Sequence, residues 1–148
     1  MAAARMDEAV RQDIVTRARA WIGTPYRHQS SLKGVGADCL GLVRGLYREL
    51  HGVEPEKMPA YSPDWAERTG AETMAEAARR HLDEIALADA LAGDIVLFRM
   101  KENGPAKHAA VLVDRQRMIH AWSGHAVAET GLDAGWRRRM AFAFSFRR

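Results

Sequence analysis

The chain has 148 residues, of which 47% are hydrophobic and 28% are charged. This length and composition suit one globular domain, spanning residues 1–148, that can bury a real core, and they exclude a largely disordered chain. The formal net charge of +3, with histidine counted as neutral, is too small to indicate a nucleic-acid-binding protein.

The N-terminal residues 1–8 lack the apolar core of a secretory signal peptide. No later stretch is long and apolar enough to span a bilayer. The single cysteine permits no internal disulfide, so nothing requires an oxidising compartment. We therefore expect a protein that is made in the cytosol without a signal peptide and has no membrane span.

An amphipathic helix is predicted from Asp7 to Trp21, because apolar residues recur there at spacings of three and four. Gly23 ends this helix, and Pro25 prevents it from resuming. The loop from Thr24 to Ala37 follows, and its proline and two glycines favour an exposed segment with a defined conformation.

A second helix is predicted from Cys39 to about Leu50, with Asp38 as its N-cap and Gly52 as its C-terminal stop. Gly41 and Gly45 weaken this helix by roughly 1 kcal/mol each relative to alanine. Two glycines so early in a helix suggest that another part of the backbone packs closely against it.

The middle of the chain is predicted to be irregular from Val53 to Asp64, because three prolines fall there. Residues Ala66 to Leu82 are rich in alanine, glutamate and arginine and favour a helix. The segment from Ala86 to Gly93 is expected to form a turn or a short helical piece.

The second half of the chain reads as strands separated by turns, which favours antiparallel pairing. Helices followed by such a meander indicate an α+β fold. The basic run 137–139 is interpreted as a solvated strand entrance, or alternatively as a contact with a polyanion or a partner. The predicted strands are Ile95–Phe98, His108–Val113, Met118–Trp122, Ala126–Thr130 and Met140–Phe146.

The lone cysteine, Cys39, is a candidate nucleophile because it begins a helix, where the helix dipole lowers a thiol pKa. His108 begins a strand after a turn and so lies at a sheet rim, where its ring can act as the base. His120, on the next strand, can hold the tautomer of His108 and share its positive charge. The backbone N–H of Cys39 and the phenol of Tyr26 are candidate oxyanion donors.

The two histidines must share one sheet face for this arrangement to work. Direct opposition of His108 and His120 places the hairpin centre at residue 114, and an odd-numbered loop, such as three residues, keeps both rings on one face. The polar run 114–117 is centred slightly later, so the alternative is a bulge or a diagonal pairing.

Alternative interpretations give these residues no catalytic role. A lone cysteine is often an inert core residue, and a histidine near a strand end is often merely solvated. A Cys/His/His metal site lacks a second ligand close to Cys39 in the sequence, so no metal is expected. Among the other histidines, His28 and His125 are candidates to line a cleft.

Four segments follow one another along the chain: Gly23-Thr24-Pro25-Tyr26-Arg27, Asp38-Cys39-Leu40-Gly41-Leu42-Val43, Gly93-Asp94-Ile95-Val96-Leu97-Phe98, and His108 to Leu112 with Met118 to Ala121. In this order they resemble the NlpC-type cell-wall peptidases, a branch of the papain-like cysteine peptidases. The resemblance implies a papain-like fold with Cys39 as nucleophile, His108 as base and His120 as the orienting residue, and no cofactor. It also implies that Tyr26 and Asp38 face the substrate.

The family's usual reaction is cleavage of peptidoglycan stem peptides, commonly between D-glutamate and a diamino acid. Two departures near the substrate cleft bear on specificity. The family often has Trp-Gly-Gly after the entrance tyrosine, where this chain has residues 28–30 as His-Gln-Ser. It often has serine after the nucleophile, where this chain has Leu40.

The middle segment from Val53 to Leu91 is similar to that of the phage-tail and gene-transfer-agent peptidases of this family. This similarity implies a virion-tail component that binds tail-tip or hub proteins and acts on the periplasmic cell wall. Two alternatives remain: a thioester-forming amidase or acyltransferase, and a catalytically idle structural tail component.

Overall fold

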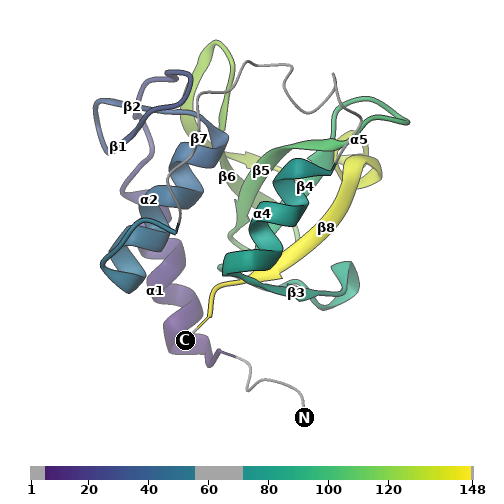
Figure 1. Ribbon diagram of the computed structural model, residues 1–148, viewed down its shortest axis with the longest axis horizontal. Helices are drawn as coiled ribbons and strands as arrows, with labels where there is room; N and C mark the ends of the chain where they lie inside the picture. Colours follow the sequence, from purple (N-terminus) through teal and green to yellow (C-terminus); the bar gives the residue numbers. More distant parts are fainter. Residues whose placement is uncertain (1–5, 56–71, 148) are drawn as a thin grey trace.

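A six-stranded antiparallel sheet carries three helices on one face and a short helix on the other (Figure 1). This computed structural model describes residues 6–55 and 72–147. The helices are α1 (Glu8–Arg19), α2 (Cys39–His51), α4 (Thr73–His81) and α5 (Ala134–Arg139), with a 3₁₀ turn at Leu87–Asp89. The predicted α+β class is confirmed.

The sheet has the strand order β3-β8-β4-β5-β6-β7, so β3 and β7 are its edges. Most of its neighbours are also neighbours in sequence, as expected for a meander. Its strands are β3 (Asp83–Ile85), β4 (Ile95–Arg99), β5 (Ala106–Leu112), β6 (Arg117–Trp122), β7 (His125–Gly131) and β8 (Met140–Ser145).

The strand β4 shows how the sheet divides the core, because it is buried on both faces. Ile95 and Leu97 pack in the cluster that contains α1, α2 and α4. Val96 and Phe98 pack in a second cluster with Trp136 of α5. Because successive side chains of a strand point to opposite faces, β4 contributes to two separate cores.

Helix α2 begins and ends where the sequence predicts. Asp38 Oδ1 accepts the N–H of Gly41 at 2.7 Å, and Gly52 ends the helix in the left-handed region at φ 80°. A methyl group at Gly41 would lie 1.8 Å from the carbonyl oxygen of Ser30, and one at Gly45 would lie 2.1 Å from the Trp21 ring. The predicted close approach is confirmed, although at Gly45 the neighbour is an indole rather than backbone.

The β5–β6 hairpin has an odd-numbered loop, as predicted, but a different centre. Val111 pairs with Ile119, and Leu112 pairs with Met118, so the hairpin is centred on residue 115. The Asp114 carboxylate accepts the N–H groups of residues 116 and 117, which fixes the turn one residue later than direct opposition requires. The expectation that His108 lies directly opposite His120 is therefore wrong, and the diagonal alternative holds.

Three further differences from the sequence prediction are local. The loop 24–37 contains two short strands, β1 (Ser31–Leu32) and β2 (Gly36–Ala37), which pair with each other. The basic run 137–139 ends helix α5 instead of opening a strand, because Asp133 caps that helix by accepting the N–H of Trp136. The predicted helix 66–82 is seen only as α4, since its first part and most of the segment 53–64 lie outside the described residues.

A buried ion pair joins α1 to the sheet. Arg11 Nη1 lies 2.9 Å from Asp94 Oδ1, and the two side chains are 3% and 0% exposed. Asp94 also accepts the hydroxyl of Ser145 and the N–H of Leu91, while Arg11 donates to the carbonyl of Ala92. Because both charges are compensated, losing one partner leaves the other buried and unpaired.

Replacing Arg11 with methionine should therefore lower the free energy of unfolding by about 3–5 kcal/mol, as measured by urea denaturation. The matched control is Arg19→Met on the same helix, because Arg19 is half exposed and its partner Glu129 keeps Arg117. This control should cost less than about 1 kcal/mol. Equal losses in the two variants would contradict the assigned role of the buried pair.

Candidate active site

The first residue of α2, Cys39, lies beside the part of strand β5 that no longer pairs with β6. The β5–β6 ladder consists of the pairs at Val111 and Leu112, and β6 continues to pair with β7 instead. Helix α2 contacts both β5 and β6. The Cys39 Sγ lies 3.9 Å from the carbonyl oxygen of Lys107, the residue before His108. The predicted nucleophile is thus brought to the strand that carries the predicted base.

The predicted histidine pair is formed. His108 Nε2 and His120 Nδ1 are 2.8 Å apart, and His120 Nε2 is 3.0 Å from Thr130 Oγ1. Both histidines are buried, with exposed fractions of 8% and 5%. Thr130 is on β7, two residues along from the position opposite His120. The sequence analysis did not identify Thr130, since no local pattern links it to either histidine.

These contacts are consistent with one tautomer for each ring. With His120 Nε2–H donating to the Thr130 hydroxyl, His120 Nδ1 is left as an acceptor. His108 Nε2–H then donates to it, and His108 Nδ1 carries a lone pair. That nitrogen makes no hydrogen bond within residues 6–55 and 72–147, so it is the atom suited to take a proton from a thiol.

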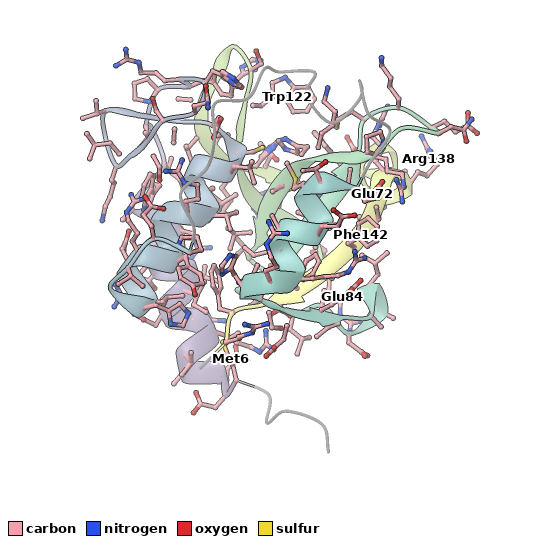
Figure 2. All side chains as sticks on the ribbon, viewed as in Figure 1. Met6, Glu72, Glu84, Trp122, Arg138 and Phe142 are labelled. Atoms are coloured by element: carbon pink, nitrogen blue, oxygen red, sulfur yellow. The ribbon has the colours of Figure 1, made fainter. Side chains whose placement is uncertain are left out.

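Aromatic rings surround the pair. The Trp136 ring centroid is 5.3 Å from that of His108 and 5.4 Å from that of His120. Trp122 lies 5.9 Å and 6.0 Å from the same two rings, and Phe98 lies 5.8 Å from His108. Figure 2 shows Trp122 at the end of the sheet where β6 passes into β7. The imidazoles therefore sit in an apolar setting.

That setting keeps the histidines uncharged. Burial, with a smaller contribution from the neighbouring His120, lowers the pKa of His108 to about 3. Burial also lowers the pKa of His120 to about 4, with a smaller contribution from His125. Near neutral pH both rings are neutral, as the tautomer assignment requires.

The thiol is uncharged as well, contrary to the expectation from the helix dipole. Burial, with a smaller contribution from the Asp38 carboxylate, raises the pKa of Cys39 to about 12. The backbone amides of Ala109, Leu40 and Cys39 act in the opposite direction but do not prevail. Within the described residues the sulfur makes no hydrogen bond to an imidazole.

The two predicted substrate-facing residues lie next to the nucleophile. Tyr26 forms a bridge with Ala37, and its pKa is raised by burial and by the charges of Asp38 and Cys39. The phenol is therefore close to both groups. Asp38 is almost completely buried, and its second carboxylate oxygen accepts the N–H of Gln29 at 2.7 Å.

The backbone at Gln29 shows what that second bond does. Gln29 has a positive φ of 65°, which non-glycine residues seldom adopt. Asp38 thus holds the entrance loop in a sparsely populated conformation, and His28 Nδ1 lies 3.8 Å from the same carboxylate. His28 is exposed and lies near the residue that precedes Cys39 in the sequence; that it lines a cleft stays a prediction.

Among residues 6–55 and 72–147 no group of three His, Cys, Asp or Glu side chains could hold a metal ion. No helix in the same ranges is long and apolar enough to cross a membrane.

The pH dependence of the free energy of unfolding should show that both histidines are neutral in the folded protein. As the pH falls from 6.5 towards 4, the unfolded chain binds protons at both imidazoles before the folded chain does, so stability should decrease. The loss should be roughly 1 kcal/mol per pH unit for each imidazole. Urea denaturation at several pH values should show a smaller slope for the double variant His108→Asn/His120→Asn. An unchanged slope in a folded double variant would contradict the neutral pair.

Comparison with known proteins matches this geometry to one family. The model of the NlpC/P60 family matches residues 23–144. No curated protein sequence is similar enough to count as a match.

Solved structures of that family share the fold. A lipoprotein-like NLP/P60 family protein from Staphylococcus aureus has 20% identity and a TM-score of 0.69, with 100% of this chain and 45% of that chain covered. This chain therefore spans less than half of that protein. The NlpC/p60 domain of the peptidoglycan hydrolase SagA has 22% identity and a TM-score of 0.66, with 92% and 98% covered.

A third solved structure with this fold belongs to a protein described as non-catalytic. RipD from Mycobacterium tuberculosis, described as a non-catalytic NlpC/p60 domain protein adapted to peptidoglycan binding, has 15% identity and a TM-score of 0.56. The match covers 93% of this chain and 96% of that one. At such identities these likenesses show the fold alone.

Proposed function

Since the chain belongs to the NlpC/P60 family, whose model matches residues 23–144, we propose that it is a peptidoglycan stem-peptide endopeptidase. The bond proposed is the one between D-glutamate and the diamino acid. The nucleophile is Cys39, the base is His108, and His120 orients the base. The proposal depends most on the 2.8 Å contact between His108 Nε2 and His120 Nδ1 beside the start of α2.

The reaction proceeds in two halves. The Cys39 thiol gives its proton to His108 Nδ1, and the sulfur attacks the peptide carbonyl carbon. The backbone N–H of Cys39 and the Tyr26 phenol donate to the developing oxyanion. His108 then passes the proton to the leaving amine, which leaves a thioester on Cys39. Water, deprotonated by His108, attacks the thioester and releases the carboxylate product and the free thiol.

Substrate binding has to shift the proton equilibrium, because thiol and imidazole are both neutral in the free protein. A stem-peptide amine placed near Asp38, as family resemblance implies, offsets the negative charge that disfavours the thiolate. The oxyanion donors then stabilise the charge once it has moved to the substrate. In this scheme the resting protein is protected from adventitious thiol chemistry.

A peptidoglycan-binding role without cleavage is the second candidate. It is favoured by the uncharged thiol and by the likeness to a structure described as non-catalytic. An amidase or acyltransferase would form the same thioester but transfer the acyl group to a different acceptor.

The biological setting is a further proposal. We propose that the protein is carried on the tail of a phage-like particle, where it binds tail-tip or hub proteins and opens the cell wall from the periplasm. Support comes from the resemblance of residues 53–91 to the tail-associated peptidases. Residues 56–71 of that segment lie outside the described residues.

Purified protein should cleave isolated stem peptides, with new amine and carboxylate ends detected by mass spectrometry. Cys39→Ala and His108→Ala should each reduce the rate by roughly 10³-fold or more. His81→Ala, at the end of α4, is the matched histidine control and should cleave as the wild type does. Intact peptides with the wild type, bound but not cut, would favour the binding role.

Alkylation of Cys39 should reveal its uncharged resting state. With iodoacetamide, the labelling rate at pH 7 should be lower than that of a free cysteine and should keep rising above pH 9, because the pKa of the thiol is raised. Rapid labelling that has already reached a plateau at neutral pH would show a resting thiolate instead.

A further inference from the structure

The indole of Trp136 touches both members of the histidine pair. Its ring is tilted by 31° from the His108 ring and stands nearly perpendicular to that of His120, at 86°. It also meets Trp122 and Phe98 edge-on, at 4.9 Å and 5.1 Å between centroids. Trp136 is thus the hub of the apolar enclosure around the pair.

Three sets of contacts fix the short helix α5, which carries this indole. Asp133 caps the helix by accepting the N–H of Trp136 at 2.9 Å. The guanidinium of Arg137 donates to the carbonyls of Leu132 and Arg115, at 3.0 Å and 2.7 Å. Trp136 also packs against the second core cluster, which contains Val96 and Phe98. So short a helix has little stability of its own, which makes these anchors the reason it forms.

Two effects of an indole on an imidazole oppose each other. Excluding water disfavours the charged ring, whereas the face of the indole attracts a cation. Burial is the largest cause of the lowered pKa at both histidines, so exclusion of water prevails in the resting protein. The attraction remains available when His108 receives a proton.

Titratable groups of other elements in the described part of the chain lie near the pair. Asp38 and the uncharged Cys39 are at the start of α2, and the Cys39 sulfur is 3.9 Å from the carbonyl oxygen of Lys107, which adjoins His108 on β5. His125 at the start of β7 acts on His120. On α5 the guanidiniums of residues 137 and 139 are engaged by carbonyl oxygens.

We propose that Trp136 is a positioning residue for the histidine pair. It keeps water from both imidazoles, fixes the plane of His108, and presents an aromatic face to the imidazolium that forms when Cys39 loses its proton. The proposal rests on the catalytic role proposed above for the pair, but its physical content concerns the imidazoles themselves.

The test is an NMR titration of the histidine side chains in isotopically labelled protein. In Trp136→Ala the pKa values of His108 and His120 should rise by about one unit or more as water enters. Trp136→Phe, which retains a ring, should restore most of the wild-type titration. Phe142→Ala is the matched control, because that aromatic ring contacts Arg79 and Arg99 and no imidazole within the described residues.

Unchanged histidine titrations in a folded Trp136→Ala variant would overturn the proposal. If that variant does not fold, Trp136→Leu should show a smaller shift in the same direction, and wild-type titrations there would overturn it equally. A wild type that cleaves no stem peptide while the titrations shift contradicts the proposed function alone. Cleavage with unshifted titrations contradicts the role of Trp136 alone.

Discussion

The docking of the start of α2 against the part of β5 that pairs with β4 but no longer with β6 is the contact on which the site depends. The β5–β6 ladder ends at Val111, so the carbonyl of Lys107 faces the Cys39 sulfur instead of a neighbouring strand. Cys39 packs with the helix-side core, whereas the imidazoles stack on aromatic rings of the opposite face. The end of the β5–β6 ladder thus leaves the residue before His108 in contact with the Cys39 sulfur.

Burial, more than the helix dipole, sets the charge state at this contact. A helix terminus contributes only a partial positive charge, and its effect falls off within the first turn. Loss of solvent around the thiol and around the imidazoles acts on the full charge of each ion. The result is a pair of neutral reactants, with thiol and imidazole pKa values of about 12 and about 3. A thiolate–imidazolium pair in the resting protein would need solvent or a partner that this enclosure withholds.

The sequence was informative where the determinant is local. Asp38 and Gly52 act within one helical turn of the ends that they cap, and the loop length of the β5–β6 hairpin preserves the shared face of the histidines. The exact register depends on the Asp114 turn and differs by one residue. The roles of Thr130 and Trp136 arise from side chains that meet across strands and across a helix, with sequence separations of ten and more. No periodicity in a single chain marks such contacts.

Asp38 shows why local sequence rules predicted the start of α2 correctly but the ionisation state of the Cys39 thiol incorrectly. Its carboxylate accepts two backbone N–H groups, one that starts α2 and one that holds Gln29 at positive φ. The same negative charge lies beside Cys39 and raises the pKa of its thiol. Removing the charge would take away only the smaller cause of the raised thiol pKa, and it would leave the N–H groups of Gly41 and Gln29 without their acceptor. The backbone geometry of the loop 24–37 and the start of α2 therefore depends on the same carboxylate that disfavours ionisation of the thiol.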